Sequence, residues 1–174
     1  MPEAAVRADL RTWLGFLAMC VAMFMAILDI QIVASSLTAI GGALGIAHDD
    51  LSWIQTAYLV AEVIAIPLSG WLTRAFGLRW LMAGATLGFT VSSLGCALAG
   101  DFAALVAWRI VQGLFGGLLI PGVFTAGFTL FPPTHHTKVA TIAGSFAMIA
   151  PTIGPALGGW LTETTSWHWM FLIN

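Results

Sequence analysis

Five long apolar stretches constrain this chain more than any other feature of its sequence. Each contains roughly 20 residues or more, the length of helix that crosses a hydrocarbon core of about 30 Å. Hydrophobic residues make up 59% of the 174 residues and charged residues only 8%, a balance far from that of a soluble domain. We therefore predict an all-α integral membrane protein with one transmembrane domain, residues 1–174. The predicted helices are residues 13–37, 51–73, 81–99, 102–131 and 139–161, with a sixth helix that begins at residue 167.

The charged residues of the predicted loops separate by sign between the two sides of the membrane. Five of the six Lys and Arg residues lie on one side, namely Arg7, Arg11, Arg74, Arg79 and Lys138. The loops on the other side carry Asp49, Asp50, Asp101 and Glu163, with neither Lys nor Arg. Because basic loops stay in the cytoplasm, we predict a multi-pass protein of the cytoplasmic (inner) membrane with a cytoplasmic amino terminus.

Three ionisable side chains, Asp29, Glu62 and Arg109, lie within the predicted membrane helices. An Asp or Arg near the centre of a membrane helix costs at least about 2.5 kcal/mol on insertion, so such residues usually face a wet cavity or pair with each other. At about 1.5 Å per residue, Asp29 and Arg109 fall in the same outer half of the membrane, where they can pair. Glu62 falls near the midplane. Two interpretations of the pair stay open: a permanent ion pair that holds two helices together, or a group that takes part in proton coupling.

The segment Ala150–Gly159 places two prolines and three glycines inside an apolar stretch. Gly154 and Gly158 lie four residues apart, so their bare backbones form a flat stripe against which another helix can pack closely. Pro151 and Pro155 each remove a backbone donor and bend the helix axis. The segment is therefore expected to contact another helix closely, which a plain lipid anchor does not require.

Three segments resemble motifs of the major facilitator superfamily. The segment Ala150–Gly159 resembles the antiporter motif of helix 5, which contains Gly-Pro-x-x-Gly-Gly; the matching residues are Pro151, Gly154, Pro155, Gly158 and Gly159. Leu105–Gly117 resembles the helix 4 motif, with Arg109, Gln112 and Gly113 at its Arg, Gln and Gly. Leu28–Val33 resembles the helix 1 motif of the fourteen-helix drug:proton antiporters, with Asp29 at the acidic position.

A fourth segment, Gly70–Trp80, resembles the loop motif between helices 2 and 3 that helps to gate the cytoplasmic side. It retains Gly70, Gly77 and Arg79, but Arg74 stands where most of the superfamily has Asp. Simple anchoring by positive charge is an alternative interpretation of Arg74. Gly-Trp-Leu followed by a basic residue is similar to the EmrB-like multidrug efflux permeases of this branch, as is the closing sequence WHWMFLIN.

The resemblance implies the amino-terminal half of the superfamily's fold and proton-coupled efflux of amphipathic drugs or other small toxic compounds by alternating access. We expect a proton from outside to neutralise a membrane carboxylate, Asp29 as first candidate and Glu62 as second, with Arg109 as partner. We expect the Gly and Pro residues of the helix 5 motif to give the interface between two half-bundles its close fit. Protons and a small-molecule export substrate are then the ligands, within a lipid bilayer. In a double-membraned bacterium, a periplasmic adaptor and an outer-membrane channel are the implied partners.

Other classes of protein fit less well. We expect no enzyme, because the sequence GSFA at residues 144–147 has no suitable His in a facing helix to act as a base. We expect no metal site, because His135 and His136 lie inside whereas His48 and His168 lie outside. No cofactor and no nucleic acid partner is expected.

The sequence includes only eight residues of the sixth predicted helix, 167–174. We therefore expect an amino-terminal fragment of a longer transporter whose carboxy-terminal half is missing. A non-transporting membrane subunit or a remnant half-carrier is the alternative.

Overall fold

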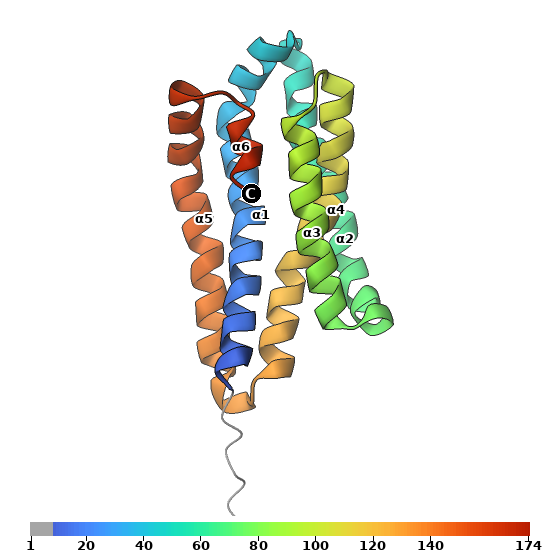
Figure 1. The fold of residues 1–174 in the computed structure, drawn as a ribbon, viewed down its shortest axis with the longest axis vertical. Helices are drawn as coiled ribbons and strands as arrows, with labels where there is room; N and C mark the ends of the chain where they lie inside the picture. Colours follow the sequence, from blue (N-terminus) through green and yellow to red (C-terminus); the bar gives the residue numbers. More distant parts are fainter. Residues whose placement is uncertain (1–8) are drawn as a thin grey trace, which may run out of the picture.

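The computed structural model describes residues 9–174, over which the chain folds into an upright bundle of helices (Figure 1). Arg7 lies outside the described residues. Five helices are long and apolar enough to cross a membrane, which confirms the predicted all-α membrane class. In chain order the elements are α1 (Leu10–Leu44), η1 (His48–Asp50), α2 (Leu51–Phe76), α3 (Leu78–Ala97), α4 (Phe102–Leu130), η2 (Pro133–His135), α5 (His136–Thr164) and α6 (Trp169–Leu172).

Helix α1 extends seven residues beyond its predicted end at Leu37. Gly41 does not stop the helix. A side chain there would collide with Leu51, whose Cδ1 lies 3.1 Å from the position of an added Cβ, so Gly41 lets the start of α2 approach α1. The helix ends instead at Gly45, which adopts a left-handed conformation (φ 63°) and donates its N–H to the Gly41 carbonyl oxygen. This left-handed ending is the one that glycine favours.

The predicted loop between the second and third helices is reduced to one residue. Gly77 (φ 79°) separates α2 from α3, so Arg74 lies in the last turn of α2 and Arg79 in the first turn of α3. Both arginine side chains are exposed, and the Arg79 guanidinium lies 5.8 Å from the centroid of the Trp80 ring. A single residue with positive φ makes the reversal, which explains why glycine is found there.

Helix α4 packs along α2 and α3, α1 packs along α5, and α1 and α4 meet between these two groups. Glycines allow the closest approach of α4 to α2. A Cβ at Gly117 would lie 2.5 Å from the Glu62 carbonyl oxygen and 2.9 Å from the Ala65 Cβ, and a Cβ at Gly113 would collide with the Tyr58 carbonyl oxygen. Gly113, predicted as part of the helix 4 motif, therefore brings the backbone of α4 against α2.

The glycine stripe of α5 packs on α1. A Cβ at Gly154 would collide with the Cβ of Gln31, and a Cβ at Gly158 would lie 2.8 Å from the Ile32 carbonyl oxygen. The stripe therefore faces a helix of the same bundle. The expected place of the helix 5 motif at an interface with a second half-bundle stays a prediction. Pro151 and Pro155 are exposed on the surface of α5, and Gly159 has open space where a side chain would extend.

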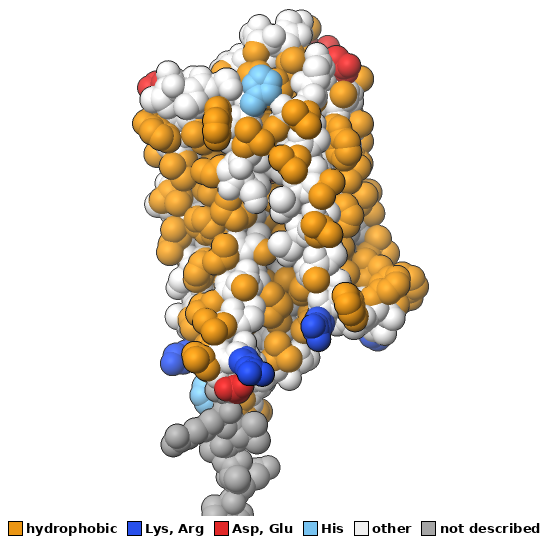
Figure 2. All heavy atoms as spheres, viewed as in Figure 1, with side chains coloured by type: hydrophobic (Ala, Val, Ile, Leu, Met, Phe, Trp, Pro, Cys, Tyr) orange, Lys and Arg blue, Asp and Glu red, His pale blue; other side chains and the backbone are white. Residues whose placement is uncertain are grey.

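The two ends of the bundle differ in charge. In Figure 2, Lys and Arg side chains gather at the lower end, where the chain enters α1 and where α2 meets α3. Acidic side chains mark the upper end, and the N-cap of α1, Asp9, adds an acidic side chain at the lower end. The wall between the two ends is mainly hydrophobic. This surface suits a bundle that crosses a bilayer with its basic end on one side.

Candidate functional site

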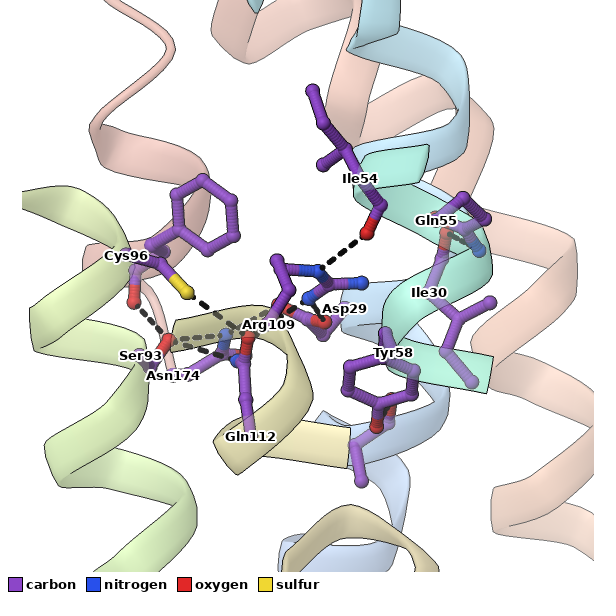
Figure 3. A network of polar contacts seen from close by, with 12 residues as sticks. Asp29, Ile30, Ile54, Gln55, Tyr58, Ser93, Cys96, Arg109, Gln112 and Asn174 are labelled. Atoms are coloured by element: carbon purple, nitrogen blue, oxygen red, sulfur yellow. Dashed lines mark hydrogen bonds and ion pairs between the residues drawn. The ribbon is translucent and has the colours of Figure 1, made fainter. Parts of the chain in front are cut away.

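A buried ion pair joins the two central helices. Arg109 Nη1 of α4 lies 2.5 Å from Asp29 Oδ2 of α1, and both side chains are fully buried (Figure 3). The pairing predicted from their depths is therefore confirmed. Taking one partner away from a buried pair typically costs about 3–5 kcal/mol, because the other charge remains without compensation. Each of the two charges is consequently stable in this buried place only while the other is present.

Gln112 closes the pair into a three-residue network. It lies one helical turn after Arg109, so both side chains leave the same face of α4. Its Oε1 accepts a hydrogen bond from Arg109 Nη1 at 2.8 Å, and its Nε2 donates to Asp29 Oδ1 at 3.2 Å. Gln112 is also fully buried. The Arg and Gln of the helix 4 motif thus contact the acidic residue of the helix 1 motif.

Helix α2 also contacts the Arg109 side chain. Arg109 Nε donates to the Ile54 carbonyl oxygen at 3.3 Å, and the guanidinium carbon lies 4.2 Å from the centroid of the Tyr58 ring. A cation at this distance from an aromatic face is attracted to it. Arg109 Nη2 is buried and has no hydrogen-bond partner within residues 9–174. Arg109 therefore contacts Asp29 of α1, Gln112 of α4 and the backbone and Tyr58 ring of α2, and its Nη2 remains a donor without a partner within residues 9–174.

Two residues of the network, Ser93 on α3 and Asn174 after α6, were not predicted from the sequence. Asn174 Nδ2 donates to Asp29 Oδ1 at 3.0 Å and to Ser93 Oγ at 2.9 Å. Gln112 Nε2 also donates to Ser93 Oγ, at 3.2 Å. Asn174 is the only asparagine of the given sequence and follows the apolar residues 170–173, which was a usable signal. Ser93 gave none, because a serine in a membrane helix commonly bonds to its own helix.

Glu62 lies on the same face of α2 as Ile54 and Tyr58, one turn beyond the tyrosine. It is 7% exposed, and its Oε1 has no hydrogen-bond partner within residues 9–174. Glu62 is therefore a buried carboxyl group that faces the same α2–α4 contact as the network without being bonded to it.

The remaining predicted motif residues form no hydrogen bond within this network. Gly70, Arg74, Gly77 and Arg79 lie in the second half of α2 and at the α2–α3 junction. The residues of the helix 5 motif lie on α5, two of them against α1. Over residues 9–174, the structure contains no group of three His, Cys, Asp or Glu residues that could hold a metal ion.

The arrangement suits reversible proton binding. Asp29 is a carboxylate whose neighbours Arg109, Gln112 and Asn174 all donate to it. Adding a proton removes the negative charge that balances Arg109 and changes which neighbours can bond to the carboxyl group. One proton can therefore alter contacts among α1, α3, α4 and α6.

Comparison with known proteins gives one family and several relatives. The family profile described as Major Facilitator Superfamily matches residues 19–174. The chain is 45% identical over 173 residues to the "Colistin resistance protein EmrB" of Acinetobacter baumannii, covering 99% of this chain and 34% of that protein. It is 37% identical over 163 residues to the "Probable multidrug resistance protein EmrY" of Escherichia coli, covering 93% of this chain and 32% of that protein.

A third relative is the "Multidrug export protein EmrB" of Haemophilus influenzae. It is 35% identical over 158 residues, which cover 91% of this chain and 31% of the relative. The chain thus spans about a third of the length of these curated relatives.

Proposed function

Because the chain belongs to the major facilitator superfamily, we propose that it serves proton-coupled export of amphipathic drugs or other small toxic compounds by alternating access. The observation that carries this proposal is the fully buried ion pair between Asp29 and Arg109 at the contact of the two central helices. A charge pair in the membrane interior is costly to keep and is a typical mark of a proton or ion pathway.

In the proposed mechanism, a proton from outside binds to Asp29 and neutralises it. Arg109 then loses the charge that holds it, and the balance between outward-open and inward-open states of the carrier shifts. Proton release to the cytoplasm restores the pair. Substrate export follows because substrate and proton favour different states of the same bundle.

Glu62 is the second candidate for the proton-binding group. It is buried, its Oε1 has no hydrogen-bond partner within residues 9–174, and it lies on the face of α2 that holds Arg109. A carboxyl group in such a position can exchange a proton without breaking an existing side-chain bond at that oxygen. We propose Asp29 as the first candidate for this group and Glu62 as the second.

The substrate class is inferred from the relatives. Three of them carry names that refer to multidrug export, multidrug resistance or colistin resistance. These names support a small, toxic and amphipathic export substrate. In a double-membraned bacterium we propose a location in the inner membrane and cooperation with a periplasmic adaptor and an outer-membrane channel.

The proposed exchange is tested in proteoliposomes that contain the full-length protein and a pH-sensitive dye. Ethidium, an amphipathic aromatic cation, serves as the transported probe, and colistin as a second one. Addition of a probe is expected to release protons from the protein, and a proton gradient is expected to drive the probe against its own gradient. If neither probe moved with a proton gradient and neither released protons, a non-transporting membrane subunit would become the better interpretation.

The proposed orientation places the basic end of the bundle in the cytoplasm. Single cysteines at positions 49, 101 and 163 are expected to react with an impermeant thiol reagent added to intact cells, and cysteines at 74 and 137 are not. All five positions are exposed in the structure, so a lack of labelling reports the side of the membrane and not burial. The background protein lacks Cys20 and Cys96, which are both buried. The reverse labelling pattern would overturn the orientation.

A further inference from the structure

The chain at the end of α6 is hydrogen-bonded to two side chains of the network, Asp29 and Ser93. Asn174 Nδ2 donates to Asp29 Oδ1 of α1 at 3.0 Å and to Ser93 Oγ of α3 at 2.9 Å. Ser93 Oγ in turn donates to the Phe171 carbonyl oxygen of α6 at 2.8 Å. The carboxylate of Asp29 is therefore one of the two side chains on which the end of α6 is fixed.

The orientation of the Asn174 amide is determined by its neighbours. The single proton of Ser93 is used by the Phe171 carbonyl, so Ser93 Oγ can only accept from Asn174 and Gln112. A carboxylate also only accepts. The NH2 group of Asn174 must then face both partners, which leaves Asn174 Oδ1 buried and without a hydrogen-bond partner within residues 9–174.

Gln112 and Asn174 share Asp29 Oδ1 but differ in how firmly they are held. Gln112 Nε2 also bonds to Ser93, and Gln112 Oε1 accepts from Arg109 at 2.8 Å and from the Cys96 thiol at 3.5 Å. Within residues 9–174, the side chain of Asn174 has hydrogen bonds only to Asp29 and Ser93. A change at Asp29 therefore affects a larger share of the contacts of Asn174 than of Gln112.

Protonation of Asp29 weakens the attachment of α6, whether the proton binds to Oδ1 or to Oδ2. A proton on Oδ1 would face two N–H donors, and Asn174 could accept it only by turning its amide and losing its bond to Ser93. A proton on Oδ2 would face Arg109 and remove the negative charge that strengthens all three donated bonds.

We propose that Asn174 is a positioning residue that couples the place of α6 to the proton on Asp29. With Asp29 ionised, α6 is tethered to α1 and α3; with Asp29 protonated, the tether opens and α6 moves away from α3. This inference rests on the proposed function in taking Asp29 as the proton-binding group.

The ionisable groups that face Asp29 are few. They are Arg109 from α4, Tyr58 and Glu62 from α2, and Cys96 from α3. On α5, His136 and Lys138 lie in the first turn and Glu163 in the last, and His168 precedes α6. The titration of Glu62 is separated from that of Asp29 by repeating each measurement in Glu62→Gln.

The test measures the distance between α3 and α6 in the full-length protein by pulsed electron paramagnetic resonance. Spin labels are attached to cysteines that replace Leu94 and Leu172, which are 45% and 43% exposed. Cys20 and Cys96 are fully buried and stay in place. In the otherwise unchanged protein, the distance is expected to be short at high pH and long at low pH. In Asp29→Asn it is expected to be long at every pH.

Asn174→Ala is expected to lose the short distance at every pH. It is also expected to shift the infrared carboxylate band that Asp29 shows at high pH, because the carboxylate loses one of its three hydrogen-bond donors. Ser93→Ala is expected to act on the distance in the same direction. Its matched control is Ser92→Ala, because the neighbouring Ser92 is equally buried and its hydroxyl donates only to carbonyl oxygens of α3 itself.

A distance that follows pH in Asn174→Ala as it does in the parent protein would overturn the inference, as would an effect of Ser92→Ala equal to that of Ser93→Ala. If Asn174→Ala does not fold, Asn174→Ser and Ser93→Ala carry the same comparison. A parent protein that releases protons on addition of ethidium, but whose distance ignores pH, would overturn the coupling of α6 and leave the proposed function standing.

Discussion

Replacing Asp29 by Asn is expected to reduce proton-coupled export to the level of protein-free liposomes while the protein still binds ethidium. Asn has nearly the volume of Asp and retains an oxygen that can accept from Arg109, but it cannot take up or release a proton. The group that links the two transport steps is then absent. Substrate-induced proton release and gradient-driven ethidium transport are the measurements, with ethidium binding measured on the same protein.

The controls for Asp29→Asn separate charge from packing. Asp29→Glu retains an ionisable carboxyl group and is expected to keep part of the activity. Because Asp29→Asn leaves the Arg109 charge uncompensated, some loss of stability, about 3–5 kcal/mol at most, accompanies the change and is measured by thermal unfolding. Proton exchange at the normal rate in Asp29→Asn would remove Asp29 from the mechanism and make Glu62 the leading candidate.

The ion pair shows what a sequence can predict about a membrane site. Asp29 and Arg109 lie in uninterrupted helices, so their depth follows from counting residues at a fixed rise, and the cost of burying a charge then selects the partner. Because these inferences use only distance along a straight helix, they did not require the arrangement of the bundle. Gln112 was predicted only as part of the helix 4 motif, and its bonds to Arg109 and Asp29 are known from the structure.

Asn174 shows where such reasoning stops. Its role depends on the turn at Thr165–His168, which brings α6 back beside α3 and α1 (Figure 1). Counting along the chain gives neither the direction nor the rotation of a helix of four residues. Ser93 was missed for a related reason: its neighbour Ser92 bonds within α3, whereas Ser93 faces α6, and only the rotation of α3 distinguishes the two.

The helix ends show a second limit. The first helix was predicted to end at Leu37, before Gly41 and Gly42, which both lie inside α1. Glycine weakens an isolated helix. In the bundle, Gly41 is a contact point for Leu51, and the closer packing outweighs the weak propensity. The same residue type ends the helix four positions later at Gly45. Sequence alone does not distinguish a glycine that packs from one that turns.

The contact between α1 and α5 is formed one turn from the ion pair. Gly158 lies against Ile32, which follows Asp29 by three residues on α1, and the Ser36 hydroxyl donates to the Gly158 carbonyl oxygen at 3.3 Å. Ile32 is fully buried. A displacement of α5 at Gly158 therefore acts on the segment of α1 that carries Asp29.

Gly158→Leu is expected to impair export strongly, and Gly159→Leu is not. A Cβ at position 158 would lie 2.8 Å from the Ile32 carbonyl oxygen and 3.1 Å from its Cα, atoms of a helix backbone that cannot turn aside. Overpacking of this kind typically costs about 1–3 kcal/mol, and about 1.4 kcal/mol already changes an equilibrium tenfold. At position 159, a Cβ would meet no atom within 4 Å. The two variants therefore add the same side chain to neighbouring residues of one motif, and only one of them separates α5 from α1.

The measurement is the initial rate of ethidium export per molecule of inserted full-length protein, because both variants add an apolar side chain and neither should hinder insertion. We expect the rate of Gly158→Leu to fall roughly tenfold or more and that of Gly159→Leu to stay near the rate of the unchanged protein. Equal rates for the two variants would show that close contact of α5 with α1 is not needed for transport. A loss confined to Gly159→Leu would instead place the functional face of the motif on the exposed side of α5, where Pro151 and Pro155 lie.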